Sequence, residues 1–276
     1  MRYLKTWVPV FLLSFALVLP STAQRKKITE TVDFSASGRV QVDTYKGSID
    51  VTTWDRNEVE IEAIVEADGN GALVAFTEVH IRQSGNRLRI ESDYSKAKKE
   101  GQKLRNWGKN NMSLPFVHYK IKMPKTADLI IEDYKSEITI ESLVADLDLE
   151  TYKGEARIYG VTGDLRIDTY KGDVKITELA GSLEADTYKG NITAEFAEFS
   201  GNSSIDTYRG DVRLRLPRDA GFDLNANLGN KGDLDTNFGL SDVSIEKNKY
   251  RGTVGGGGPN LEVDTHRGRI EVSSSR

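Results

Sequence analysis

The stretch LRIDTYKGDVKITELAGS, residues 165–182, contains the pattern that decides the fold, because its motif Asp-Thr-Tyr-Lys-Gly recurs along the chain. The motif tyrosines at positions 134, 152, 170, 188 and 208 are 18, 18, 18 and 20 residues apart. A fixed short period is typical of a solenoid, in which each repeat packs against its neighbours. The sequence therefore predicts a row of stacked, nearly identical units.

Each unit has the pattern of two short strands and two turns. Apolar and polar residues alternate in residues 165–169 and 173–177, as expected for half-buried strands. Tyr170-Lys171-Gly172 turns the chain between them, and Gly181 closes a second turn after an inward Leu179. We predict an all-β fold, a β-solenoid of the parallel β-helix kind, with about 18 residues per coil and about 4.8 Å between layers. A sandwich of antiparallel hairpins is the alternative, but identical turns at identical spacing favour the solenoid.

The regions on either side of the regular repeat predict less regular β caps, which protect the open edges of a solenoid. Alternating strands are expected in residues 40–51, 59–63 and 88–91, and the pattern returns at 261–272 after loosening beyond Pro217. Residues 94–111 are rich in Lys and Arg and predict a solvated basic loop. An alternative role for this loop is to grip an anionic envelope polymer or lipid headgroups.

The first 23 residues have the composition of a secretory signal peptide. Arg2 and Lys5 precede an apolar run at 8–19, and small residues at 21–23 offer a cleavage site. An uncleaved anchor is the alternative. We expect a signal peptide at 1–23, a single β-strand-repeat domain at 24–276, and an exported protein that is periplasmic, on the cell surface or secreted.

Charge and composition exclude several partners and cofactors. Without its leader the chain keeps 36 of its 38 Lys and Arg residues against 42 Asp and Glu, a net charge of −6. This mild acidity argues against nucleic acid as a partner. The absence of cysteine excludes disulfides and thiolate metal sites, and no later segment is apolar enough to form a transmembrane span.

Stacking of the coils would align the motif side chains in columns. The candidate ligand-binding residues are Tyr152, Tyr170, Tyr188 and Tyr208 with Lys153, Lys171, Lys189 and Arg209, beside an acidic column of Glu150, Asp168, Asp186 and Asp206. Other outward positions differ between repeats, so a specific requirement maintains the motif. That requirement is either stability, from stacked aromatic rings and neighbouring charges of opposite sign, or recognition. In recognition, the tyrosines would stack on sugar rings and the cations would hold anionic groups.

Catalytic motifs are lacking in this sequence, so we expect no enzymatic activity, no cofactor and no metal site. The histidines at 80 and 118 lie in strand-like stretches, and His266 occupies the tyrosine position of a motif copy. Acidic residues occur in every coil, so no pair is distinguished as the catalytic pair of a glycosidase.

The chain resembles the bacterial putative adhesin family, a β-strand-repeat domain of unknown function. The residues that carry the likeness are 38–42, 47–51, 54–55, 117–124, 214–217, 255–258 and 261–265. The resemblance implies an exported or envelope-associated β-solenoid, but it supplies no catalytic residues and does not by itself establish adhesion.

The sequence thus predicts an adhesin-like binder or envelope scaffold that presents its columns to an envelope polysaccharide or another envelope protein. One alternative is a polysaccharide-acting enzyme built on a β-helix. Another is a structural envelope protein that self-associates through exposed solenoid edges.

Overall fold

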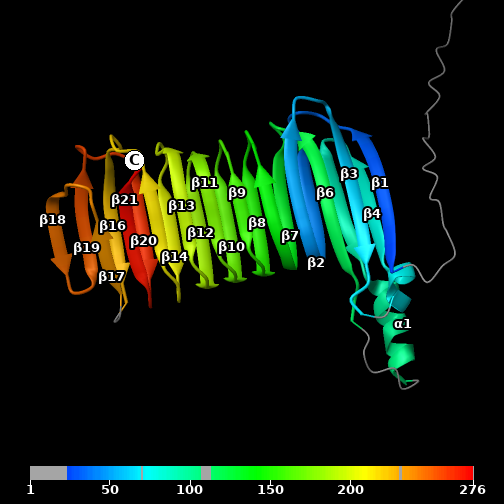
Figure 1. Ribbon diagram of the computed structural model, residues 1–276. Coiled ribbons are helices and arrows are strands. Elements are labelled where there is room, and N and C mark those ends of the chain that lie inside the picture. The colour runs from blue at the N-terminus through cyan, green and yellow to red at the C-terminus, as the bar shows by residue number, and fades with distance from the viewer. Residues whose placement is uncertain (1–23, 70, 107–112, 230–231, 276) are drawn as a thin grey trace, which may run out of the picture.

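The computed structural model describes residues 24–69, 71–106, 113–229 and 232–275 (Figure 1). The predicted signal peptide, residues 1–23, lies outside the described part of the chain. Strands stand side by side in a long row, with the N-terminal strands and helix α1 at one end and β17 to β19 at the other (Figure 1). The prediction of an all-β fold is confirmed.

The strands form two layers, because the two strands of each repeat pair with different neighbours. The first layer contains, in spatial order, β4 (Glu78–Ser84), β5 (Arg87–Asp93), the first half of β2 (Arg39–Trp54), the first half of β7 (Asp128–Glu141), β8 (Leu147–Lys153), β10 (Leu165–Lys171), β12 (Leu183–Lys189), β14 (Ser203–Thr207), β20 (Asn260–Thr265), β16 (Phe222–Leu228), β19 (Lys249–Val254) and β18 (Ser241–Glu246).

The second layer contains, in the same direction, β1 (Arg25–Asp33), β3 (Glu58–Glu66), β6 (Phe116–Pro124), the second halves of β2 and β7, β9 (Ala156–Tyr159), β11 (Val174–Ala180), β13 (Ile192–Glu198), β15 (Val212–Leu216), β21 (Arg269–Ser274) and β17 (Asp233–Thr236). Because β2 and β7 run through both layers, hydrogen bonds connect all the strands into one 21-stranded sheet.

The central strands pair in parallel, and each motif residue lies beside its equivalent in the next repeat. Leu165 of β10 pairs with Leu147 of β8 and Leu183 of β12, and Lys171 pairs with Lys153 and Lys189. These partners are 18 positions apart, so the sequence period equals the pairing offset. The inward side chains, among them Leu165, Ile167, Val174, Ile176 and Leu179, are almost completely buried in one continuous core.

The motif glycine is required because neighbouring turns approach too closely for a side chain. A Cβ atom on Gly172 would overlap the carbonyl oxygen of Gly154, and one on Gly154 would overlap the carbonyl oxygen of Ser136. Gly190 and Gly210 repeat the same contact along the row. The glycine of the motif is therefore explained by backbone packing alone.

The N-terminal end corrects one expectation, because residues 95–106 of the predicted basic loop form a helix, while residues 107–111 of that loop lie outside the described part of the chain. Residues Ser95–Asn106 form α1, which packs on the short 3-10 helix η1 (Gly71–Phe76) through the buried Ala97 and Gly101. The Asp93 side chain accepts a hydrogen bond of 2.7 Å from the backbone N–H of Ser95. The expectation of a loop was wrong. The buried face of α1 consists of small residues in a strongly charged segment, so the sequence shows little of the apolar periodicity that indicates a helix.

The C-terminal end contains an inserted coil. Strand β20 lies between β14 and β16, and β21 lies between β15 and β17. The segment from β16 to β19 precedes β20 in the sequence but lies further along the row than β20 and β21. Its strands β18 and β19 pair antiparallel at the end of the row. Antiparallel strands β1, β3 and β4 occupy the other end.

Candidate functional site

A continuous column of aromatic rings runs along the turn edge of the molecule. This tyrosine column consists of Tyr45, Tyr134, Tyr152, Tyr170, Tyr188, Tyr208 and His266. Successive ring centroids are 4.7 to 5.0 Å apart, and successive ring planes are within 11° of parallel. Strand pairing sets this spacing, because paired strands lie about 4.7–4.9 Å apart.

The tyrosine column exposes ring edges and hydroxyl groups to solvent. The six tyrosines are 37 to 39% exposed, and each ring face inside the column is covered by the ring of the next repeat. Stacking of sugar rings on these faces, one mode expected from the sequence, is therefore not available within the column. Contacts with a partner would use the hydroxyl groups and the electropositive ring edges.

Cationic side chains form a basic column beside the tyrosines. Its members are Lys135, Lys153, Lys171, Lys189, Arg209 and Arg267. The nitrogen atoms of Lys153 and Lys171 lie 5.2 Å from the centroids of Tyr152 and Tyr170, which places each cation beside its own tyrosine.

The basic column is electrostatically unsatisfied. Among the described residues, no carboxylate oxygen lies within 4.0 Å of the charged nitrogen atoms of Lys153, Lys171, Lys189 or Arg209. Like charges that repeat at about 4.8 Å repel by about 0.9 kcal/mol per pair even at the dielectric constant of water. An anionic partner would relieve this repulsion.

A shallow groove runs beside the basic column. Its lining includes Lys135, Lys153 and Lys171, the glycines Gly154 and Gly172, and the acidic residues Glu137, Glu155 and Asp173. The lysines recur once per layer along this groove, since Lys171 pairs with Lys153 and Lys153 pairs with Lys135. An extended chain that follows the row could therefore contact several lysines in succession.

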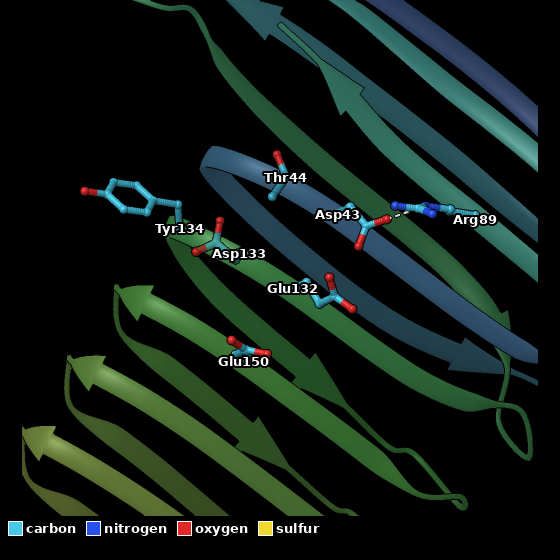
Figure 2. Close-up of a pocket in the computed structure, with 7 residues that line it drawn as sticks. All are labelled: Asp43, Thr44, Arg89, Glu132, Asp133, Tyr134 and Glu150. Atoms are coloured by element: carbon cyan, nitrogen blue, oxygen red, sulfur yellow. Dashed lines mark hydrogen bonds and ion pairs between the residues drawn. The ribbon is translucent and has the colours of Figure 1, made fainter.

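The acidic column lies on the other side of the tyrosines. It consists of Asp43, Glu132, Glu150, Asp168, Asp186, Asp206 and Asp264. Figure 2 shows Asp43, Glu132 and Glu150 in a row on adjacent strands, with Arg89 beside Asp43. Arg89 Nε lies 2.6 Å from Asp43 Oδ2, so this end of the acidic column is partly neutralised.

Crowding of carboxylates changes the acidity of this column. Partial burial, followed by repulsion from Asp206 and Asp168, raises the pKa of Asp186. Partial burial and repulsion from Asp264 likewise raise the pKa of Asp206. In both cases the charged form is disfavoured in the folded protein, so the acidic column is maintained at a cost in stability.

The first two motif copies differ from the rest in ways that the sequence did not reveal. Lys46 is only 7% exposed, and its Nζ atom lies 2.6 Å from Asp68 Oδ2 and 4.3 Å from the centroid of the Phe116 ring. This lysine therefore belongs to a structural ion pair and not to the exposed basic column. Its partner, Asp68, is distant in sequence and carried no recognisable signal.

The second copy compensates for the loss of the motif threonine and glycine. Asp133 replaces the threonine, and its carboxylate accepts hydrogen bonds from the Ser136 backbone N–H at 2.7 Å and the Ser136 hydroxyl at 2.6 Å. Thr151 donates a further hydrogen bond to the same carboxylate at 3.0 Å. Burial raises the pKa of Asp133 despite these donors.

The eight candidate residues from the sequence all lie on the turn edge, in two adjacent columns. Tyr152, Tyr170, Tyr188 and Tyr208 stack on one another, and Lys153, Lys171, Lys189 and Arg209 follow them in the chain. Their role in ligand binding stays a prediction, because stacking by itself is also a stabilising interaction.

Within the described ranges, one group of side chains has the composition of a metal site. Glu78, His80 and Asp93 place one ligand atom each within 4.8 Å of one another, and all three are partly buried. Hydrogen bonds from Ser95 are the main cause that lowers the pKa of Asp93 to about 2. Glu78 already pairs with Lys96 at 2.6 Å, so a cation would compete with that ammonium group.

Comparisons with known proteins identify a family. Residues 39–273 match the family described as Toastrack DUF4097. A search of the curated proteins finds no match. In the part of the chain that the structure describes, no helix has the length and apolar character needed to span a bilayer.

Several solved structures are similar to this chain at low sequence identity. A "putative adhesin" from Bacteroides fragilis is 14% identical, with a TM-score of 0.43, over 91% of this chain and 97% of that chain. A "putative cell adhesion protein" from Clostridium sporogenes is 12% identical, with a TM-score of 0.39, over 91% and 100% of the two chains. A "putative lipid binding protein" from Parabacteroides distasonis is 13% identical, with a TM-score of 0.31, over 91% and 97%. Since the family match extends over most of the sequence, the chain belongs to the Toastrack DUF4097 family.

Proposed function

We propose that this chain is an exported, non-enzymatic β-solenoid, with about 18 residues per coil, that binds an extended anionic polysaccharide of the cell envelope along its basic column. The observation that carries the proposal is a series of cations that recur once per layer, have no ion-pair partner among the described residues, and lie beside partly exposed tyrosines. A periodic surface of this kind fits a partner that is itself long and repetitive.

The chemistry of the surface favours an acidic polymer. Each exposed cation contributes about 0.2–1 kcal/mol to a single ion pair in water. Four such contacts on one chain add up, because the first contact raises the effective concentration of the next anionic group. Tyrosine hydroxyls would add hydrogen bonds to sugar hydroxyls, and binding would weaken as salt screens the charges.

The proposal is tested by binding of residues 24–276 to polygalacturonate, a polymer of uronic acids, with neutral dextran as the control ligand. The triple variant Lys153→Gln, Lys171→Gln and Lys189→Gln should weaken binding to polygalacturonate at least tenfold at low salt. Its far-ultraviolet circular dichroism should stay unchanged, because all three side chains reach solvent.

A matched variant removes three cations from the outer face of the second layer, Arg157→Gln, Lys175→Gln and Arg213→Gln. These residues share one column, since Lys175 pairs with Arg157 and Thr193, and Thr193 pairs with Arg213. This variant should retain binding within about a factor of two. Equal losses of binding in the two triple variants would show that net charge alone drives binding and would refute a defined binding surface. An absence of binding of the unaltered chain to polygalacturonate would also refute the proposal.

A further inference from the structure

The C-terminal end of the row exposes an apolar strand. All six residues of β18 are exposed, and Val243 and Ile245 are 53% and 60% exposed, the highest values among the large hydrophobic residues described. Within the described chain, β18 pairs with β19 on one side, which leaves the backbone groups of its other side open. Such an edge is a template for pairing with another chain.

This strand is uncovered because the two layers end at different levels. Beyond β20 the first layer continues with β16, β19 and β18, whereas beyond β21 the second layer continues with β17 alone. Ile245 lies beside Tyr250, which lies beside the buried Ala226, so Ile245 is on the inner face of the first layer. No strand of the described second layer lies opposite it.

The N-terminal end has the opposite step. Beyond β2 the second layer continues with β6, β3 and β1, whereas the first layer continues with β5 and β4. The first layer is therefore the longer one at the C-terminal end, and the second layer is the longer one at the N-terminal end. If a second copy continues the row beyond the C-terminal end of the first, the protruding β18 of the first copy lies beside the recessed β4 of the second.

The strand directions at this junction allow antiparallel pairing. Strand β18 runs in the direction of the central first-layer strands, because two antiparallel pairings connect it to β16. Strand β4 runs in the opposite direction, because it is antiparallel to β5. Translation of one copy along the row therefore brings β18 and β4 together as an antiparallel pair.

The sequences of the two edges match in that arrangement. Antiparallel alignment places Val243 opposite Ile81 and Ile245 opposite Val79, and both Val79 and Ile81 pack toward the core. The same register places Asp242 opposite Arg82, although β18 has a bulge between Ser241 and Ser244. It also places Glu246 opposite Glu78, whose carboxylate already pairs with Lys96. Apolar cross-strand pairs and pairs of opposite charge each stabilise an antiparallel ladder by about 0.2–1 kcal/mol.

The charges of the two ends are complementary. The C-terminal edge strands carry exposed acidic residues, namely Asp233, Asp235, Asp242 and Glu246. The N-terminal edge strands carry four basic residues, Arg25, Lys26, Lys27 and Arg82, against three acidic residues, Glu30, Asp33 and Glu78, so their net charge is opposite in sign but small. Several of these already form exposed pairs within the chain, such as Arg82 with Glu91, and exposed pairs exchange partners at little cost.

From these observations we propose that β18 of one copy pairs with β4 of a second copy, so that the protein assembles head to tail. The contact joins two different surfaces, so each added copy leaves one free β18 and one free β4. The product is an open row of copies in which the first layer continues across each junction. The proposal concerns the ends of the row and is independent of the polysaccharide surface on the turn edge.

The experiment measures the mass of residues 24–276 by sedimentation velocity over a wide concentration range. The unaltered chain should grow through dimers to longer species, whereas Ile245→Lys should need at least tenfold higher concentration to associate. Because Ile245 is mostly exposed, this variant should keep its melting temperature. Val144→Lys, which alters a valine that is 44% exposed and far from both ends, is the control and should associate normally.

A mixing experiment tests the polarity of the contact. Arg82→Glu should block the β4 end, and Ile245→Lys should block the β18 end, so each variant alone should be monomeric. Their mixture retains one intact contact and should form dimers that do not grow further. A monomeric unaltered chain would overturn the proposal, as would equal association of Ile245→Lys and Val144→Lys. Dimers of unaltered chain that do not grow and that are insensitive to Arg82→Glu would also overturn it, in favour of a two-fold contact.

Discussion

Substitution of a tyrosine inside the column separates stacking energy from the rest of the fold. Tyr170 stacks on Tyr152 at 4.7 Å and on Tyr188 at 4.9 Å, both within 3° of parallel. Each stacked pair contributes about 0.5–1.5 kcal/mol beyond the burial of area. Tyr170→Ala should therefore lower the free energy of unfolding by about 1–3 kcal/mol from stacking alone, in addition to the apolar area lost.

A control with the same exposure isolates this contribution. Tyr159 is 37% exposed, as is Tyr170, but it belongs to none of the aromatic pairs among the described residues. Tyr159→Ala should thus lose the burial term without the stacking term. Tyr170→Phe keeps the ring and should cost less than about 0.5 kcal/mol.

The assay is equilibrium unfolding in urea, with thermal melting as a second measurement. For a chain of this size, 1–3 kcal/mol corresponds to a decrease in melting temperature of about 2–12 °C. Equal losses for Tyr170→Ala and Tyr159→Ala would show that stacking contributes nothing and that the tyrosines are maintained for another reason. A loss in Tyr170→Phe as large as that in Tyr170→Ala would assign the effect to the hydroxyl group.

Two further predictions concern the glycine and the acidic column. Gly172→Ala should lower the free energy of unfolding by about 2–4 kcal/mol in a urea titration, because the added Cβ has no space, whereas Gly239→Ala, where space is open, should change it by less than about 0.5 kcal/mol. The pKa of Asp186 is higher in the folded chain than the value of about 3.9 expected when it is unfolded. Between these two pKa values the folded state binds more protons, so the free energy of unfolding falls as the pH rises through this interval. Asp186→Asn should therefore increase stability at pH 7 and low salt by about 1–2 kcal/mol, from two neighbouring carboxylates. At pH 3 or in 1 M salt, the melting temperatures of Asp186→Asn and the unaltered chain should differ little. A stability gain at pH 3 or in 1 M salt as large as that at pH 7 and low salt would contradict the electrostatic explanation.

The regular part of the fold could be predicted because each repeat is stabilised by neighbours with the same sequence. The alternation around Tyr170 and the turn at Gly172 identified both strands of a coil, and the 18-residue period gave the pairing offset. Inward and outward faces followed from the alternation alone, since a one-residue slip would expose every apolar side chain.

The remaining features depend on contacts between segments that share no repeat. Helix α1 was missed because its buried residues are Ala97 and Gly101, which give little hydrophobic signal. The burial of Lys46 depends on Asp68 and Phe116, which lie outside the motif copies. The covered ring faces of the tyrosine column follow from the side-chain orientation, which the period alone does not determine.

The position of the C-terminal coil has a consequence for the biosynthesis of the chain. On this side β14 pairs with β20, as Ile205 does with Val263, and not with β16, which is the first-layer strand synthesised next. This pairing of β14 therefore requires residues that are synthesised more than fifty positions later. Repeats up to β15 can stack in the order of synthesis. The segment from β16 to β19 has no strand of the existing stack to pair with until β20 and β21 are synthesised. Truncation near residue 259 would therefore remove a layer from inside the stack and leave the segment before it without support, instead of shortening the row from its end.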